Sequence, residues 1–551
     1  MNTGAPPVLA NDARPASDPL FSAAAVLDWK RWAYWLPSLW LWITLFVELA
    51  PEWSTNAQYS HGWLVPALGA ALLRQRWRSR PPPAPEAQWR PAWNALMILG
   101  ILAYLPLRWL EQGNPEWRLL LWVHAGVAAL VTGAQLAILG GRRWVSFFAF
   151  TILWPWIAVP WPTGLENAVV QQLTRAAASL TTELANLTGI PAFQQGNVIE
   201  IRTGVVGIEE ACSGIRSLQA ALLGSLFLGA LFSLSTPRRW ALLSLSVALA
   251  FAANVARTYT LVFVAHQHGL KEAERVHDGA ALVAMGAGLG GLFLAAKWLE
   301  RSPRLPAVAP APDSDRRVPG ALFSPALVLW PAAWMILATV AVEGWYRSAE
   351  RSLLAHARFW VDESAIERSA APIAIPERTR AMLRYGDAKA LAWKEANGDV
   401  WRLYWLRWDP GRNSAQLARA HTPEICLTGA GGQIVHRWPR QNFSAAGLDL
   451  AFDQYEFRFG QREMHVFYCL WQDREAAVGP AGLATASDDG SAMSRVRAAW
   501  AGRRNLGQTV LEVAVVGPRD AEEARSALKQ QLSKWVSKSS AAGAVFEKSP
   551  E

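Results

Sequence analysis

The sequence predicts a polytopic α-helical membrane protein with about nine transmembrane helices, followed by a soluble C-terminal α+β domain. Three observations support this fold class. The first part of the chain consists mainly of apolar segments, each close to the roughly 20 residues that a helix needs to cross a bilayer. The basic residues between these segments gather on alternate connections. Residues 344–551 are more polar and contain short runs of alternating apolar residues, which are typical of strands.

The composition also indicates a membrane protein. Of the 551 residues, 52% are hydrophobic and 31 are tryptophan, a residue enriched at membrane interfaces. Residues 1–28 are rich in Ala, Pro and Asp and predict a disordered tail without the features of a signal peptide, and residues 301–320 predict a proline-rich linker. The crossings are expected at 33–49, 62–76, 93–110, 118–139, 144–161, 217–236, 239–264, 279–298 and 321–343.

The basic clusters predict the orientation of these crossings. By the positive-inside rule, the connections that carry them face the cytoplasm; they lie at 28–32, 73–80, 140–144, 236–240 and 297–317. The intervening connections then face outward, at 50–61, 111–117, 162–216 and 265–278. A cytoplasmic N-terminus and nine crossings leave residues 344–551 outside. The formal charge of +9 is thus a topological signal, and no nucleic-acid partner is expected.

The stretch GIEEACSGIRSLQA, residues 207–220, places charge and a thiol beside the sixth predicted crossing. An amphipathic helix at about 166–188 and a hairpin with Thr203-Gly204 as its turn are expected before it. Ser213 is a plausible N-cap, so Cys212 would stand at the positive end of a helix. Arg216, four residues further on, would lie on the same face. Both features favour the thiolate, which is the nucleophilic form of cysteine.

Two other polar residues are predicted to lie at the same membrane depth. Arg257 follows the cytoplasmic start of its crossing by about 18 residues, or roughly 27 Å of helix, and His277 stands where the next crossing begins. A thiolate, a proton-shuttling histidine and an arginine that stabilises an oxyanion would suit acyl transfer. Asp278 could orient the histidine, and two other carboxylates compete for that role, Glu209 and Glu210.

Each of these signals also has a structural interpretation. A single membrane cysteine usually packs, a histidine at a helix start is commonly interfacial, and an arginine near a helix end can snorkel to the interface. Only their coincidence at one depth favours catalysis. The HQH cluster at 266–268 lacks further ligands, so neither a metal nor another cofactor is expected.

Three motifs, EEACSGIRSLQ, NVARTYTL and HDGAA, occur in this order along the chain. Together with YSHGWLVP (59–66) and GNVIEI (196–201), they resemble the exosortase/archaeosortase family of membrane transpeptidases over residues 29–300. The resemblance implies that Cys212 is the nucleophile and that Arg257 and His277 are its essential partners. Asn254, within the second motif, is a supporting candidate.

The resemblance also implies a substrate and a location. Exosortases are expected to cleave exported proteins at C-terminal sorting signals of the PEP-CTERM type, which combine a short Pro-containing motif, a membrane helix and a basic tail. The setting would be the inner membrane of a bacterium that makes exopolysaccharide, with residues 344–551 in the periplasm. The implied partners are these membrane-anchored proteins, the lipid bilayer and, for transfer rather than hydrolysis, an acceptor amine.

The C-terminal region carries a motif of its own. HTPEICLTGAGG, residues 421–432, resembles the signature of the exosortase-associated periplasmic domain, here joined through the ninth crossing at 321–343. Its polar residues His421, Glu424 and Cys426 are expected to have a structural or substrate-handling role, with a second thiol site as the alternative. Strands are predicted at 400–408, 455–460, 464–471 and 509–517, and an amphipathic helix at 519–538.

The chain has three cysteines. In an oxidising exterior Cys426 and Cys469 could pair, which would leave Cys212 as the thiol. Two other classes of function stay open: a transporter for a polysaccharide or lipid-linked precursor, and a membrane anchor that displays the outer domain. If the membrane part is only an anchor, substitution of Cys212 would not affect function. A transporter would need Arg257 more than the thiol, whereas an enzyme would need Cys212, Arg257 and His277.

Overall fold

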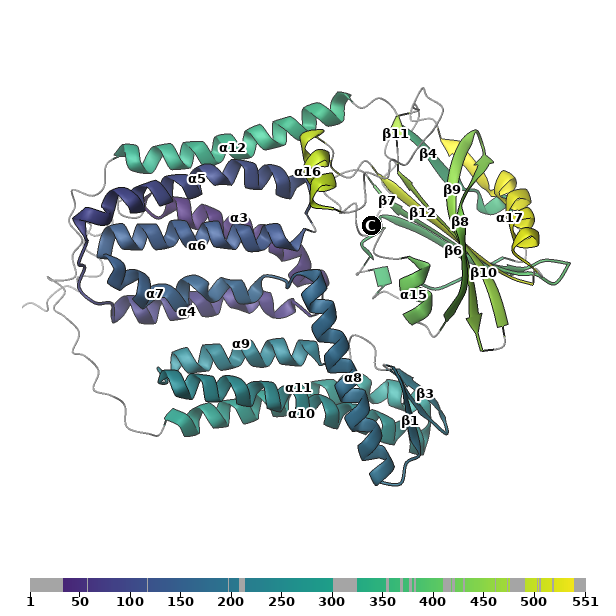
Figure 1. Cartoon of the computed structure of the whole chain (residues 1–551), viewed down its shortest axis with the longest axis horizontal. Helices are drawn as coiled ribbons and strands as arrows, with labels where there is room; N and C mark the ends of the chain where they lie inside the picture. The colour runs from purple at the N-terminus through teal and green to yellow at the C-terminus, as the bar shows by residue number, and fades with distance from the viewer. Residues whose placement is uncertain are drawn as a thin grey trace, which may run out of the picture.

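The computed structural model describes two parts of the chain. The first is residues 33–300, except 57, 116, 197 and 208–213. The second is residues 325–539, except 353–355, 367–369, 376–378, 381–382, 410–417, 419–421, 430–431, 461, 473, 476–490, 503, 505–506 and 518–519. The helices of the first part and the first helix of the second part form a bundle, and a β-rich domain lies beside one end of it (Figure 1).

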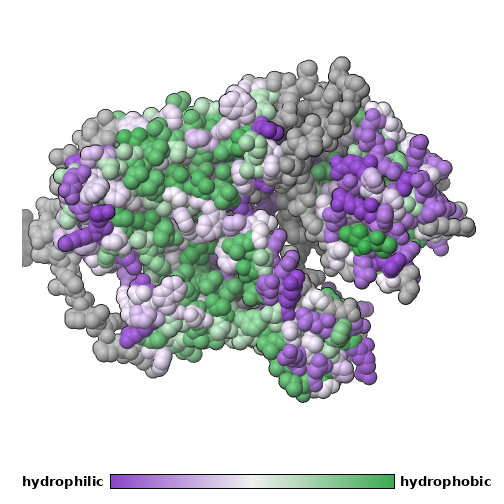
Figure 2. Space-filling view, in the orientation of Figure 1, coloured by the Kyte–Doolittle hydropathy of each residue, from purple (hydrophilic) through white to green (hydrophobic). Residues whose placement is uncertain are grey.

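The bundle is built from long apolar helices whose axes run in a common direction (Figure 1). They are α3 (Leu36–Thr55), α4 (Leu64–Arg78), α5 (Arg90–Gly113), α6 (Arg118–Gly140), α7 (Arg142–Leu153), α9 (Ile215–Leu231), α10 (Thr236–His268), α11 (Leu270–Glu300) and α12 (Pro325–Ser352). Hydrophobic residues cover the visible side of these helices, whereas hydrophilic residues dominate the C-terminal domain (Figure 2). This surface is what a bilayer requires of a membrane-spanning bundle.

The number of crossings is smaller than predicted when length and composition are the criteria. Within the described residues, four helices could each cross a membrane: Ala87–Gly113, Arg118–Gly140, Thr236–His268 and Leu270–Glu300. A fifth span is possible if Arg142–Ala158 and Thr163–Leu187, which meet at 77°, count as one. The nine predicted crossings are therefore not confirmed. Helices form at the other predicted segments, but α4 has 15 residues and α9 has 17, short of the roughly 20 required.

A tilted helix and a small sheet fill the longest predicted outward connection. The amphipathic helix expected at 166–188 is α8 (Thr163–Leu187). It leads into an antiparallel sheet of order β1-β2-β3, in which β1 was not predicted: Ala192–Gln195, Val198–Ile201 and Gly204–Gly207. Ile201 pairs with Gly204, so Arg202 and Thr203 form the hairpin turn. The predicted turn, Thr203-Gly204, was wrong by one residue.

The C-terminal domain is built around a seven-stranded antiparallel sheet. Its order is β5-β6-β7-β12-β10-β9-β8, formed by Ala371–Pro372, Asp387–Lys394, Val400–Trp408, Gln508–Val516, Arg462–Gln472, Leu448–Phe459 and Gln433–Ala445. The smaller sheet β11-β4-β13 joins Arg474–Glu475, His356–Val361 and Val536–Ser539. The helices are α15 (Pro423–Gly429), α16 (Ala492–Trp500) and α17 (Ala521–Trp535). All four predicted strands and the predicted helix at 519–538 are present.

Alternation along the strands gives the large sheet two apolar faces. Leu511 and Val513 of β12 belong to a core that also contains Leu528 of α17. Val510 and Ala514 point the other way, into a core that Leu427 of α15 helps to cover. The domain therefore has two separate cores, one on each face of the sheet.

The C-terminal domain contacts the bundle directly through α16, which packs against α5 (Figure 1). The Asn114 amide donates to the Arg495 carbonyl at 3.3 Å, and the rings of Trp109 and Trp500 meet edge to face. Arg504 forms an ion pair of 2.9 Å with Glu343 of α12. We call this end of the bundle, where α5 ends and α6 begins, the domain-side end.

A buried ionic network joins three helices near the domain-side end. Arg108 of α5 contacts Glu48 of α3 at 2.8 Å and Glu111 at 2.9 Å, and Glu111 contacts His124 Nδ1 of α6 at 2.8 Å. His124 Nε2 donates to the Leu41 carbonyl at 3.1 Å, since a carbonyl only accepts. Glu111 and His124 thus share one proton, and the four side chains together carry no net charge.

Removal of the arginine should destabilise the bundle strongly. Arg108→Met leaves Glu48 without its cation and Glu111 with His124 as its remaining partner, and we expect a loss of about 3 kcal/mol in unfolding free energy. Thermal unfolding of the detergent-solubilised chain measures this, with the exposed Arg143→Met as the matched control. Equal stability of the two variants would show that the network contributes nothing.

Candidate functional site

Three predicted site residues meet at the domain-side ends of α10 and α11. The Arg257 guanidinium Nη2 lies 2.9 Å from His277 Nε2, and His277 Nδ1 lies 2.9 Å from the Asp278 carboxylate. Arg257 is buried, the His277 side chain is 29% exposed, and the Asp278 side chain is fully exposed. Arg257 and His277, which were predicted to lie at the same depth, are therefore in direct contact. Solvent reaches the histidine.

These contacts specify how His277 is protonated. A guanidinium only donates, so Nε2 must accept from Arg257 and carries no hydrogen. The Asp278 carboxylate accepts the hydrogen on Nδ1. His277 is thus a neutral imidazole whose basic nitrogen faces Arg257, and a carboxylate holds the ring from the other side, an arrangement suited to a general base.

Gly214 connects the Cys212 segment to this site. It precedes α9 with a left-handed φ of +77°, and a Cβ on it would lie 2.7 Å from Cγ of the buried Asn254. Asn254 stands one helical turn before Arg257 on α10. A small cavity lies beneath, lined mainly by apolar residues: Leu173, Gly214, Leu218, Val247, Ala250, Phe251 and Asn254. The glycine of CSGIR is therefore required both by its backbone conformation and by a close packing contact.

Several predicted residues lie outside the described part of the chain: Glu209, Glu210, Cys212, Ser213 and His421. Arg216 is exposed on the first turn of α9 and, like Arg257, is close enough to Asp278 to interact with its charge. The site thus gathers Arg216, Arg257, His277 and Asp278 from three successive helices. No group of three potential metal ligands occurs within the described ranges.

A second ionic network, which sequence reasoning missed, holds the start of α8. Tyr59 donates to Glu166 of α8 at 2.7 Å, and Arg118 of α6 forms ion pairs with Glu166 and with Glu52. Arg384 of the C-terminal domain contacts Glu52 at 3.1 Å. The YSHGW motif therefore fixes α8 in place, and the carboxylates at its side join the two parts of the chain.

We expect Gly214→Ala to perturb this site through both strain and collision. The left-handed backbone and the contact with Asn254 should cost about 2 kcal/mol of unfolding free energy. Thermal unfolding measures the effect, and Gly133→Ala is the control because nothing lies within 4 Å of that Cβ. The double variant Gly214→Ala/Asn254→Ala should lose less than the sum of the single losses; additive losses would contradict the contact.

The motif of the C-terminal domain is only partly described. Glu424 forms an ion pair of 2.8 Å with Arg437. Burial, with a smaller contribution from Glu512, raises the pKa of Cys426 to about 12, so the thiol is protonated at neutral pH. The alternative of a second thiol site stays a prediction, because its other residue, His421, lies outside the described part of the chain.

The possible disulfide between Cys426 and Cys469 is not formed. Cys469 points into the core beneath α17, because it pairs with Leu511 on that face of the sheet. Cys426 belongs to α15, which covers the opposite face. The sheet separates the two sulfurs. Because these two cysteines do not pair, the cysteine count does not identify Cys212 as the one remaining thiol.

An unpredicted carboxylate lies on the α15 face of the sheet. Glu512 of β12 stands between Tyr404 of β7 and Tyr468 of β10, its partners in the two neighbouring strands. Burial raises the pKa of Glu512 to about 7. The only sequence signal was a glutamate at an alternating position of a predicted strand.

Glu512 makes the stability of the C-terminal domain depend on pH. Because its folded pKa of about 7 exceeds its ordinary value, the folded state favours the protonated form and loses stability as pH rises through 7. Glu512→Gln should therefore gain roughly 2 kcal/mol over the native chain between pH 5 and pH 8. Unfolding at both pH values tests this, with the exposed Glu463→Gln as control; a pH-independent difference would refute it.

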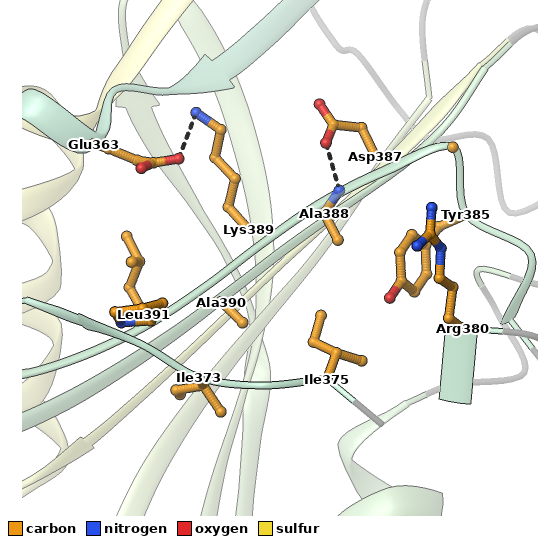
Figure 3. A pocket seen from close by; sticks show the side chains of 12 residues that line it. Glu363, Ile373, Ile375, Arg380, Tyr385, Asp387, Ala388, Lys389, Ala390 and Leu391 are labelled. Atoms are coloured by element: carbon orange, nitrogen blue, oxygen red, sulfur yellow. Dashed lines mark hydrogen bonds and ion pairs between the residues drawn. The ribbon is translucent and has the colours of Figure 1, made fainter. Parts of the chain in front are cut away.

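A groove in the C-terminal domain lies beside β5 and β6 (Figure 3). Within it, Lys389 contacts Glu363 at 3.1 Å, and the Asp387 carboxylate accepts from the Ala388 N–H at 2.8 Å. None of its lining residues belongs to the Arg257–His277 site. We assign it no role in the chemistry.

The fold and site define a polytopic membrane protein with a compact polar site at the end of its helices and a β-rich domain at the same end. Residues 53–294 match the family model described as transmembrane exosortase, which confirms the resemblance predicted for this region. No curated protein and no solved structure matches the chain. The family match ends before the C-terminal domain, whose kinship with the exosortase-associated domain stays a prediction.

Proposed function

We propose that the chain is a membrane cysteine protease or transpeptidase that cleaves C-terminal sorting signals of exported proteins at the outer face of the bacterial inner membrane. The observation that carries this proposal is the Arg257–His277 contact, within a region matched by the exosortase family. Two of the three membrane motifs bring Arg257 and His277 into contact, and the third motif carries the Cys212 thiol that acyl transfer needs.

Cys212 is the proposed nucleophile. It precedes Gly214 by two residues, and two trans peptide units span at most about 8 Å between Cα atoms. Gly214 in turn packs on Asn254, one turn from Arg257. These covalent and packing constraints support a thiol in the vicinity of the arginine and histidine.

The proposed reaction begins when His277 Nε2 takes the thiol proton. The sulfur then attacks the scissile carbonyl, and Arg257, no longer bonded to that nitrogen, stabilises the oxyanion. The C–N bond breaks, the leaving amine receives the proton from His277, and a thioester remains on the enzyme. Water or an acceptor amine then attacks the thioester and releases the thiol. Asp278 keeps the imidazole oriented and stabilises its charged form.

The location suits a substrate that is itself anchored in the membrane. Such a substrate diffuses in two dimensions and presents its scissile bond at a fixed height above its own transmembrane helix. A site at the end of α10 and α11, with His277 partly exposed, can meet that bond and admit water. Intramembrane ionisable groups are costly and usually mark function.

Processing of a reporter that carries a C-terminal sorting signal should require Cys212. We expect Cys212→Ala to abolish the gel-mobility shift of the reporter and Cys212→Ser to reduce it by at least about 100-fold, because a serine hydroxyl is far less acidic than a thiol. Cys426→Ala is the matched control and should retain processing, since that thiol is partly buried and protonated.

Other outcomes favour other functions. Processing that persists in Cys212→Ala but disappears in Cys426→Ala would move the nucleophile to the C-terminal domain. Cys212-independent processing together with a requirement for Arg257 would favour the transporter. Variants of Cys212, Arg257 and His277 that are all silent would favour a simple anchor.

A further inference from the structure

The small sheet β1-β2-β3 has two edges that differ. On the β1 edge, the Asn186 side chain of α8 donates to the Ala192 carbonyl at 3.1 Å and accepts from the Ala192 N–H at 2.9 Å. The Gln194 side chain of the same strand turns back towards the Arg175 carbonyl of α8. The β1 edge is therefore occupied by the protein itself. On the β3 edge, no further strand pairs with Gly204–Gly207 in the described part of the chain.

We propose that the edge of β3 binds the substrate polypeptide, as an added extended strand that continues to the scissile bond. The occupant is the segment immediately before the cleaved bond. Main-chain hydrogen bonds would hold it, and every second side chain would contact the sheet, as in other cases of β-strand addition. This inference rests on the proposed function, because it describes how the same site receives its substrate.

The position of β3 supports this occupant. Val206 of β3 packs on a core that contains Val262 of α10 and Ala273 of α11. His277 follows Ala273 by four residues, roughly 6 Å along the helix axis, and Arg257 precedes Val262 by five, roughly 7.5 Å. A strand laid along β3 therefore runs within one or two helical turns of both groups, and β3 itself leads into the segment that contains Cys212.

The residues of β3 also permit a close approach. The sequence is Gly-Val-Val-Gly, and a strand bordered by glycines lets another backbone come near. At Gly204 the space is limited on one side, since a Cβ there would lie 2.7 Å from the Leu270 side chain. Val205 is 52% exposed and Val206 is partly buried, so side chains of an added strand would alternate between solvent and the protein.

Three exposed positions lie at increasing distances from the β3 edge and allow the test to compare these distances. Phe193, Glu200 and Val205 are cross-strand neighbours on one face of the sheet, in β1, β2 and β3 respectively. Adjacent strands lie about 4.8 Å apart. A substrate strand added at β3 must therefore be nearest to position 205, further from 200 and furthest from 193.

The experiment is disulfide trapping in membranes with the full chain. Each enzyme carries Cys212→Ala, which preserves the uncleaved complex, and one of Val205→Cys, Glu200→Cys or Phe193→Cys. Each reporter carries a single cysteine at one of six successive positions before its cleavage site, and Cys212→Ala alone gives the background. We expect cross-links from position 205 to alternate with a period of two along the reporter and to exceed those from 193 at least about tenfold.

Cross-links that peak at position 193, or that show no alternation at 205, would overturn the inference. The same single-cysteine reporters are also given to the native chain and to Cys212→Ala. If their processing requires Cys212 but the alternating cross-links are absent, only the β3 inference fails. If the native chain and Cys212→Ala process them equally, the proposed function fails independently of the cross-links.

Discussion

Charged side chains between apolar helices must be paired, and this constraint organises the domain-side end of the bundle. An unpaired charge removed from water costs several kcal/mol even after relaxation. Arg108 is accordingly neutralised by Glu48 and Glu111, and Arg118 by Glu52 and Glu166. Each network joins helices that are distant in sequence, so the pairing fixes the helices relative to one another.

The second network has a direct consequence for the candidate site. Glu166 lies at the start of α8, and α8 leads through β1 and β2 to β3 and the Cys212 segment. Tyr59, Arg118 and, through Glu52, Arg384 therefore hold the base of the element that ends at the proposed nucleophile. Precise placement of reacting groups contributes strongly to catalysis, and these contacts would serve that purpose in the proposed enzyme.

The sequence predicted the parts of this arrangement that depend on local patterns. The common depth of Arg257 and His277 followed from helix rise, and β7 followed from alternation in VWRLYWLRW. Ion-pair partners that are distant in sequence were not predictable, since the local sequence around Glu48, Arg108 or His124 does not indicate which residues they contact. β1 was missed because AFQQ has little strand character and is held by its neighbour β2. The turn at Arg202–Thr203 was misplaced because glycine at 204 suggested a turn residue, whereas it belongs to β3.

Burial makes the two thiols of the C-terminal domain weak acids. Burial raises the pKa of Cys426 and of Cys469 to about 12, so both thiols are protonated at pH 7. Both belong to the C-terminal domain, where the sheet and its covering helices exclude water. Cys212 instead precedes a helix whose first turn carries Arg216, and the next two helices contribute Arg257 and His277. Positive charge favours a thiolate and burial opposes it, so Arg216 and Arg257 support the proposal that Cys212, rather than Cys426 or Cys469, is the nucleophile.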